Sequence, residues 1–322
     1  HATLRIPTDF VATAESKTNI RLSWFDNSSN ETGYEIQRAT DPAGPFTTIH
    51  TTGANVESYN NDNIAQNTAY VYRVRAVRTS PAATSEWATV AMASTFDKII
   101  LVNANGDFGI STLNAPAPWN NLNTETGEFV DEDGFTWYNF TDDSPAPSTV
   151  DLQVFNYTGG GSRQDRGYIG TGPIYPNNVM MTNYLYNANS GSEWRLFQLD
   201  PNAAYDLVFF GTEWEGTGYN GASRARWGEK VSTDFTVGTV KKSLYNVKNN
   251  NERVFFTNIS PEQDSTIHFR VDATVYGSEV ITSAFFNSVE IRSYTPIEAA
   301  FDKIAPSIPL NLVASNIATD SV

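Results

Sequence analysis

Cysteine is absent from the 322 residues of this chain, and histidine occurs only three times. The chain therefore has no disulfide, no cysteine nucleophile and no Cys/His zinc site, so its stability must come from packing. No apolar run reaches the roughly 18 residues that a transmembrane helix needs. Patterns with helical period are also nearly missing. These absences point away from membrane insertion and from helical folds.

Positive charge is scarce as well. The sequence has 21 basic against 36 acidic side chains, which gives a net charge of −15. Such a chain repels phosphate backbones and anionic lipid, so nucleic acid and membrane surfaces are not expected as partners. Hydrophobic residues make up 40% of the chain and aromatic residues 13%, which is enough to fill real cores. The composition is therefore that of a folded acidic protein.

Short runs in which apolar and polar residues alternate are abundant, with Gly, Pro, Asn and Thr between them. This period of two is typical of half-buried β-strands, and many such strands without helices favour antiparallel sandwiches. The sequence therefore predicts an all-β fold. The clearest predicted strands lie at residues 19–25, 33–39, 69–77, 205–211, 233–238, 253–259, 266–273 and 288–294.

Residues 1–95 contain Pro7, Trp24 in "LSW", the run "GYEIQR", Ile64 six residues before Tyr70, and "YRVRAV" followed by "SEW". With these features the segment resembles a fibronectin type III domain. The resemblance implies that Trp24 fills the core and that the hydroxyl of Tyr70 bonds to nearby backbone. Domains of this family serve as spacers or binding scaffolds.

Residues 96–296 carry the segments "APAPWNNL", "LDPNAAYDLVFFG" and "TNISPEQDSTIHFRV". Through them this part resembles galactose-binding-like jelly rolls, which are accessory modules of secreted bacterial carbohydrate-active enzymes and surface proteins. Residues 297–322 contain "APSIPLNLVAS", in which Ile308 and Pro309 repeat Ile6 and Pro7. This last segment resembles a linker and the first strand of a second fibronectin type III domain. The sequence therefore predicts a piece of a longer extracellular or cell-surface array.

The signatures of catalysis are weak. The three histidines form no zinc-binding spacing, and no G-x-S-x-G turn for a serine nucleophile occurs. A glycosidase needs two carboxylates about 5–10 Å apart. The dense acidic segments are Asp131, Glu132 and Asp133, and Glu213 and Glu215. Both segments are typical of turns or loops, so we expect no enzyme, and a polysaccharide hydrolase remains only a third hypothesis.

Sugars bind to exposed aromatic faces flanked by polar side chains. Of the seven tryptophans, Trp24, Trp137 and Trp194 are expected in cores or on sheet faces, and Trp87 is expected to cover one end of the first sandwich. The others lie in Pro-rich or Gly-rich loops, where binding residues collect on β scaffolds. The predicted ligand-binding residues are Trp119, Arg166, Trp214, Tyr219, Arg226 and Trp227.

Two functional hypotheses therefore stay open. The first is a non-catalytic glycan-binding module, which expects exposed rings converging around a cleft with Arg226. The second is a structural stalk or adhesin repeat, which expects the same rings to be buried, chiefly at the domain junction. No cofactor is expected, although Asn103, Asn105 and Asp107 offer alternating oxygen ligands for a structural calcium ion.

Overall fold

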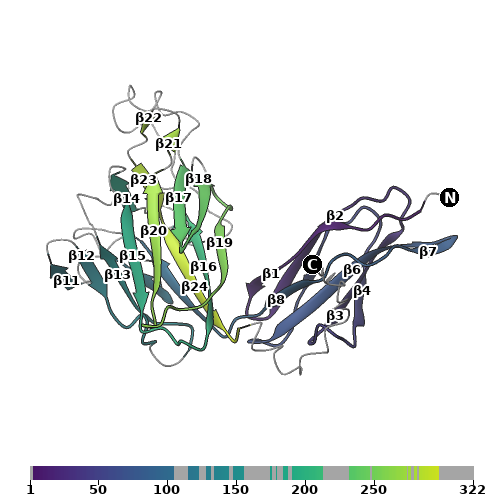
Figure 1. Ribbon diagram of the computed structural model, residues 1–322, viewed down its shortest axis with the longest axis horizontal. Coiled ribbons are helices and arrows are strands. Elements are labelled where there is room, and N and C mark those ends of the chain that lie inside the picture. The colour runs from purple at the N-terminus through teal and green to yellow at the C-terminus, as the bar shows by residue number, and fades with distance from the viewer. Residues whose placement is uncertain are drawn as a thin grey trace, which may run out of the picture.

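The computed structural model of this chain describes residues 3–104, 115–122, 128–131, 134–144, 148–155, 175, 179, 184–187, 191–212, 232–246, 249–273, 275–276, 279–280 and 283–296. Its elements are all β-strands, and they gather into a first unit of β1 to β8 and a second unit of β9 to β24 (Figure 1). The all-β prediction is confirmed. Among the described residues no helix has the length and apolar character needed to span a bilayer.

The first unit is a sandwich of two antiparallel sheets. One sheet has the order β1-β2-β5, and the other has the order β4-β3-β6-β7 with β8 also paired to β6. The strands are β1 (Thr8–Ser16), β2 (Asn19–Phe25), β3 (Gly33–Ala39), β4 (Thr47–Thr51), β5 (Ser58–Asn61), β6 (Ala69–Thr79), β7 (Ala82–Thr84) and β8 (Ala91–Ser94).

Alternation explains the core of the first unit. In β2 the side chains of Ile20, Leu22 and Trp24 are buried while their neighbours face outward. The Trp24 ring lies 5.5 Å from the ring of Tyr34, and both belong to the core of this unit. The hydroxyl of Tyr70 accepts a hydrogen bond of 3.1 Å from the backbone N–H of Ala65. Both expectations for this unit, the core tryptophan and the corner tyrosine, are confirmed.

Trp87 has a different place from the one expected. Its ring is half-buried and lies against two guanidinium groups, with Arg73 Cζ at 4.2 Å and Arg75 Cζ at 4.3 Å from the ring centre. These arginines alternate along β6 with the buried Val74, so they stand on the outer face of the sheet. Trp87 therefore packs in a cation–π row on the sheet face and does not cover the end of the sandwich.

The second unit contains a five-stranded sheet in the order β10-β9-β24-β16-β19 and a seven-stranded sheet in the order β11-β12-β13-β15-β20-β17-β18. Two short pairs, β14 with β23 and β21 with β22, complete it. The first sheet consists of β9 (Lys98–Asn103), β10 (Trp119–Asn121), β16 (Ala204–Phe210), β19 (Val254–Ile259) and β24 (Ser288–Tyr294). The second consists of β11 (Glu128–Asp131), β12 (Gly134–Trp137), β13 (Asp151–Phe155), β15 (Ser192–Phe197), β17 (Ser232–Val237), β18 (Val240–Tyr245) and β20 (Ile267–Ala273). The pairs are β14 (Tyr184–Asn187) with β23 (Ser283–Phe286) and β21 (Val275–Tyr276) with β22 (Glu279–Val280).

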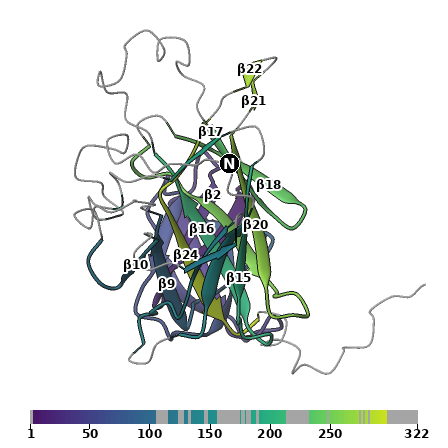
Figure 2. The same ribbon diagram turned by 90° about the vertical axis from the view of Figure 1, so that its left-hand side faces the viewer.

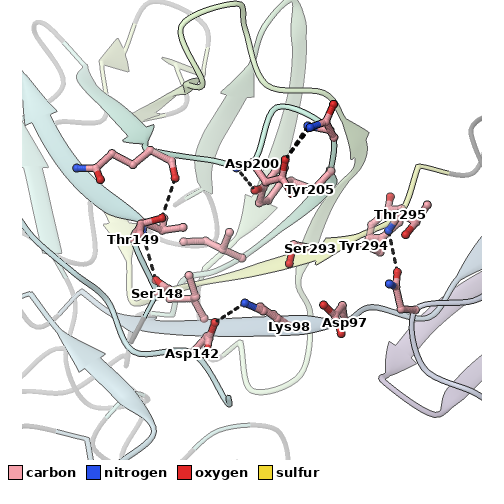
Figure 3. Close-up of a pocket in the computed structure, with 17 residues that line it drawn as sticks. Asp97, Lys98, Asp142, Ser148, Thr149, Asp200, Tyr205, Ser293, Tyr294 and Thr295 are labelled. Atoms are coloured by element: carbon pink, nitrogen blue, oxygen red, sulfur yellow. Dashed lines mark hydrogen bonds and ion pairs between the residues drawn. The ribbon is translucent and has the colours of Figure 1, made fainter. Parts of the chain in front are cut away.

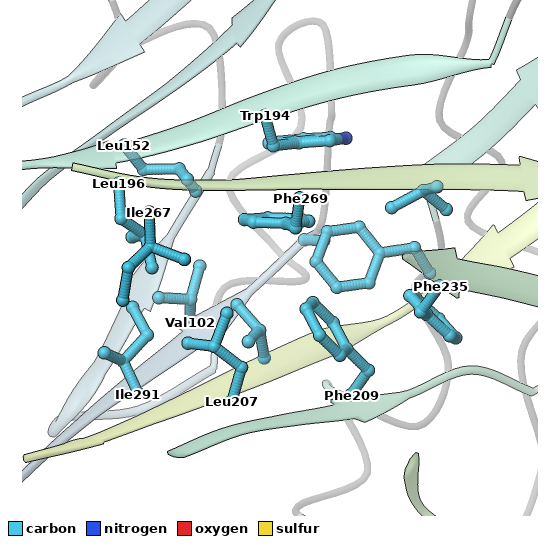
Figure 4. Close-up of a cluster of buried hydrophobic side chains, with 14 of the residues drawn as sticks. Val102, Leu152, Trp194, Leu196, Leu207, Phe209, Phe235, Ile267, Phe269 and Ile291 are labelled. Atoms are coloured by element: carbon cyan, nitrogen blue, oxygen red, sulfur yellow. The ribbon is translucent and has the colours of Figure 1, made fainter. Parts of the chain in front are cut away.

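These two sheets pack face to face around a core rich in aromatic residues, in which side chains from both sheets point toward one another (Figure 4). The ring of Phe209 in the five-stranded sheet stacks on Phe235 of the seven-stranded sheet at 4.7 Å. Trp194 is 1% exposed and stacks on Phe269 at 5.8 Å. Such ring pairs stabilise a core by about 0.5–1.5 kcal/mol beyond the area they bury. Trp137 is also buried here, as expected for it and for Trp194.

The outer face of the five-stranded sheet is covered as well. All seven residues of β16 are buried, although only every second one, such as Leu207 and Phe209, can face the core between the sheets. Glu290 and Arg292 occupy the same outer face on β24, and both are buried. The first unit approaches this face from the side of β1 and β8, and Figure 2 shows it behind the second unit when the model is turned. The outer face of this sheet is therefore where the two units meet.

Candidate functional site at the junction of the two units

The two units share one hydrophobic cluster at the junction. Ala204 and Tyr294 of the second unit belong to the cluster that contains Trp24, Tyr70 and the rest of the first core. Phe96 lies in the connection between the units and is 2% exposed in the same cluster. Burying apolar surface at about 25 cal/mol per Å² favours a fixed arrangement of the two units over a flexible connection.

A buried ion network crosses this junction. The Arg292 guanidinium donates to Glu290 Oε2 through Nε at 3.0 Å and Nη2 at 2.7 Å, and its Nη1 donates to the carbonyl oxygen of Ala14 in the first unit at 2.8 Å. Arg253 lies 3.3 Å from Glu290 Oε1 and 3.2 Å from Glu15 Oε2, again across the junction. Two arginines of the second unit therefore each reach β1 of the first unit.

The charges in this network stabilise one another. Burial by itself raises the pKa of Glu290, but the charge of Arg292, the hydrogen bond from the Tyr175 hydroxyl and the charge of Arg253 outweigh it and hold that pKa below its usual range. Burial also raises the pKa of Tyr175 well above the ordinary tyrosine value. Glu290 thus stays a carboxylate and Tyr175 stays a donor, so every member has a defined bonding role.

Further polar contacts fix the same arrangement at its margins. Lys17 Nζ of the first unit lies 2.8 Å from Asp143 Oδ2 of the second unit. The Thr295 N–H, directly after β24, donates to Asn67 Oδ1 at 2.8 Å. The first of these is half-exposed and contributes little alone, whereas separating the units would break the buried bond of Arg292 to Ala14 and the part-buried bond of Arg253 to Glu15.

A second buried cluster lies beside the network. The Tyr294 hydroxyl donates to Asp206 Oδ1 at 2.7 Å, and the Asn258 N–H donates to the same oxygen at 3.0 Å. Burial raises the pKa of Asp206 above its ordinary value despite these two bonds and the charge of Arg292. Asp206 is therefore held by its hydrogen bonds, and no ion pair between described residues includes it.

A polar cavity of about 600 Å³ opens at the other side of the junction (Figure 3). Its walls carry three carboxylates, Asp97, Asp142 and Asp200, against one ammonium group, Lys98. Lys98 Nζ lies 3.7 Å from Asp142 Oδ2, and the backbone N–H of Asp200 donates to the Tyr205 hydroxyl at 2.9 Å. No group of three or more metal-ligating side chains occurs among the described residues. The carboxylates of this cavity can accept hydrogen bonds from the hydroxyl groups of a ligand. Its lining residues include no exposed aromatic ring on which the face of a sugar could stack.

Trp119 is the one predicted ligand-binding residue that the structure describes. It begins β10, which pairs in parallel with β9, and its ring is 9% exposed. Tyr175 packs edge-on against that ring at 5.4 Å in a small cluster with Phe210. The ring also borders a cavity of about 500 Å³ at the junction, lined in part by Glu15 and Arg253. Trp119 is therefore packed at the junction, as the stalk hypothesis expects, and is not the exposed ring that the glycan-binding hypothesis expects.

The remaining predicted ligand-binding residues lie outside the described residues, so the convergence of their rings stays a prediction. They are Arg166, Trp214, Tyr219, Arg226 and Trp227. The same holds for most of the acidic segments weighed for catalysis and for Asn105 and Asp107 of the calcium hypothesis. The described member of that calcium set, Asn103, donates from its amide to Asn121 Oδ1 at 2.8 Å.

Sequence reasoning missed the ion network, although it placed the strand correctly. Residues 288–294 were predicted as a half-buried strand, on which Glu290 and Arg292 would ordinarily face water. The available signal was the spacing: two opposite charges two residues apart on one face of a strand, followed by Tyr294 on that face. Such a pair forms a local ion pair, and only the covering unit makes it buried.

Comparison with known proteins supports the assignment of the first unit. Residues 5–90 match the family model of the fibronectin type III domain, so the chain contains such a domain followed by further all-β sheets. Among solved structures, an Fn3-like protein from Clostridium thermocellum is 26% identical, covers 28% of this chain and 92% of its own, with a TM-score of 0.25. A fibronectin type III domain of human collagen XX is 22% identical, covers 30% of this chain and 95% of its own, with a TM-score of 0.25. No curated protein matches the chain.

Proposed function

We propose that this chain is a non-catalytic accessory segment of a larger extracellular or cell-surface protein. In this proposal the fibronectin type III domain holds the second unit in a fixed orientation, and the second unit is a galactose-binding-like jelly roll that binds carbohydrate. The observation that carries the proposal is the network in which Arg292 and Arg253 reach Ala14 and Glu15 across the junction. A fixed orientation serves a module that must present a binding face away from its neighbours.

Carbohydrate is the proposed partner because of the sequence resemblance of residues 96–296 and because hydroxyl and amide groups line the cavities beside the junction. Polyhydroxylated ligands need such groups as donors and acceptors. The other partners in this proposal are the neighbouring domains of the same polypeptide. The strong acidity of the chain, with a net charge of −15, again argues against nucleic acid.

The alternative function is a structural stalk or adhesin repeat, and the packing of Trp119 against Tyr175 favours it. In that case the aromatic side chains of the loops serve contacts within the protein, and the second unit contributes length and rigidity. The two functions share the fixed junction and differ in whether a soluble or insoluble glycan is retained.

Retention on a panel of soluble and insoluble polysaccharides separates them. The wild-type chain is compared with Trp214→Ala and Trp227→Ala, and with Tyr138→Ala as a control at an exposed aromatic residue, 43% exposed, outside the predicted loops. Carbohydrate binding predicts retention of the wild type and the control and its loss in the two tryptophan variants. If a folded wild-type chain is retained on no polysaccharide, the structural stalk or adhesin repeat is the function that remains.

A further inference from the structure

A groove of about 600 Å³ lies between the units and is distinct from the polar cavity described above. One wall is β1 and β2 of the first unit, with Val11, Arg21 and Ser23, and the other is β18 and β19 of the second unit, with Lys242 and Phe255. Because alternate residues of β2 fill the first core, Arg21 stands on the outer face of its sheet. Arg21 therefore faces the groove and not the first core.

The charge of this groove is opposite to that of the chain. Its lining carries three cationic side chains, Arg21, Lys242 and Arg253, against two carboxylates, Glu15 and Asp206. Arg253 is bonded to Glu15. Arg21 and Lys242 are exposed, and no carboxylate among the described residues forms an ion pair with either. In a chain of net charge −15, two cations without acidic partners on opposite walls of one groove favour an anionic ligand.

The backbone of the groove argues against an extended peptide as that ligand. A peptide would add to the free edge of β19, where backbone groups must be available for pairing. The carbonyl oxygen of Phe255 already accepts a hydrogen bond from Lys242 Nζ. The Asn258 N–H, in a residue with φ of +56°, donates to Asp206. The Lys242 bond occupies a carbonyl of β19, and the left-handed backbone at Asn258 interrupts the strand geometry that an added peptide would need.

The side chains of the groove fit an acidic sugar instead. Hydroxyl and amide groups of Thr13, Ser23, Asn251 and Thr257 line it, and these can bond ring hydroxyls. Apolar groups supply contact for the C–H face of a pyranose, including Met92, which is 45% exposed. An Arg guanidinium matches a planar carboxylate through two parallel hydrogen bonds, and a Lys ammonium adds a point charge.

We propose that this interdomain groove binds a carboxylate-bearing saccharide of the uronic acid class, with the sugar carboxylate held between Arg21 of the first unit and Lys242 of the second. The proposal rests on the carbohydrate-binding part of the proposed function and names both a substrate class and a site outside the predicted loops. It also gives the fixed junction a role, because the two cations come from different units.

The test is titration calorimetry of the full chain with a uronic acid trisaccharide, with the corresponding neutral trisaccharide, and with a peptide of acidic residues, in low-salt buffer. The variants are Arg21→Gln and Lys242→Gln. The matched control is Lys241→Gln, a neighbour on β18 that makes the same charge change but pairs with Asp234 at 3.0 Å and does not line the groove. All three side chains are exposed, so the variants are expected to fold, which circular dichroism verifies.

We expect the wild-type chain to bind the uronic acid trisaccharide. Its affinity should weaken about tenfold in each groove variant, because each variant loses one charge-assisted contact. In Lys241→Gln the affinity should change less than about twofold. Absence of uronic acid binding, equal binding of the neutral sugar, preference for the acidic peptide, or an equal effect of Lys241→Gln would each overturn the proposal. Retention of the wild type on neutral polysaccharides together with no binding of the uronic acid trisaccharide would leave the carbohydrate function standing while removing this site.

Discussion

Replacing Arg292 by Met is the perturbation for which the junction gives the clearest magnitude. The Arg292 side chain is 2% exposed and makes two bonds to Glu290 and one to Ala14. Without it, the buried Glu290 carboxylate keeps Arg253 and Tyr175 as its partners among the residues that the structure describes. Breaking one side of a buried ion pair costs about 3–5 kcal/mol. For a unit of this size that corresponds to a fall in Tm of roughly 6–20 °C.

The assay is differential scanning calorimetry of the whole chain, with separate analysis of the transitions of the two units. The double variant Arg292→Met and Glu290→Leu replaces the pair by apolar groups, which is often close to neutral. We therefore expect the double variant to regain at least about 2 kcal/mol relative to Arg292→Met alone. Two results would refute the idea that Arg292 and Glu290 form a buried, coupled pair. One is a loss of less than about 1 kcal/mol in the free energy of unfolding of Arg292→Met, and the other is additive effects of the two substitutions.

Three further predictions concern the cores and the pH response. Tyr70→Phe removes the acceptor of the Ala65 N–H, so urea unfolding should show the first unit destabilised by about 1–3 kcal/mol; an unchanged midpoint would contradict the corner role. Trp194→Ala empties the centre of the second core and should cost about 3–5 kcal/mol by the same measurement, with a loss below 1 kcal/mol arguing against its packing. Because the folded-state pKa of Glu290 lies below its unfolded value of 4.5, its stabilisation is present above about pH 4.5 and is lost as pH falls through the folded pKa. Thermal unfolding between pH 6 and 3 should therefore show a steeper acid loss in the wild type than in Glu290→Gln, even though the raised pKa of Asp206 acts in the opposite direction; equal slopes would contradict it.

The strands could be predicted from the sequence because most have one buried and one exposed face. Residues 19–25, 33–39 and 288–294 coincide with β2, β3 and β24, and the other predicted runs overlap strands with small differences at their ends. Trp24 and Tyr70 could be placed because a fibronectin type III domain fixes their positions by local patterning. Alternation and turn residues are local signals, so they can be recognised without knowing which segments pack against the strand in the folded protein.

The junction could not be predicted in this way, because its burial depends on a unit far away in the sequence. Arg292 bonds to Ala14, which lies 278 residues earlier, and no local pattern reports such a contact. Trp119 was expected in a Pro-rich loop, whereas it begins a short strand paired with β9 and packs against Tyr175. β10 has only three residues, which is too short to show the alternation of apolar and polar residues that marks a strand, so the burial of Trp119 could not be inferred from the sequence.

The buried network holds the two units in one orientation. Because the chain has no cysteine, the variant Thr47→Cys and Gln263→Cys places one spin label on an exposed position of each unit. Electron–electron double resonance then measures the distribution of distances between the labels. We expect a single narrow distribution that broadens when Arg292→Met is added. A broad distribution in the chain with its network intact would contradict it.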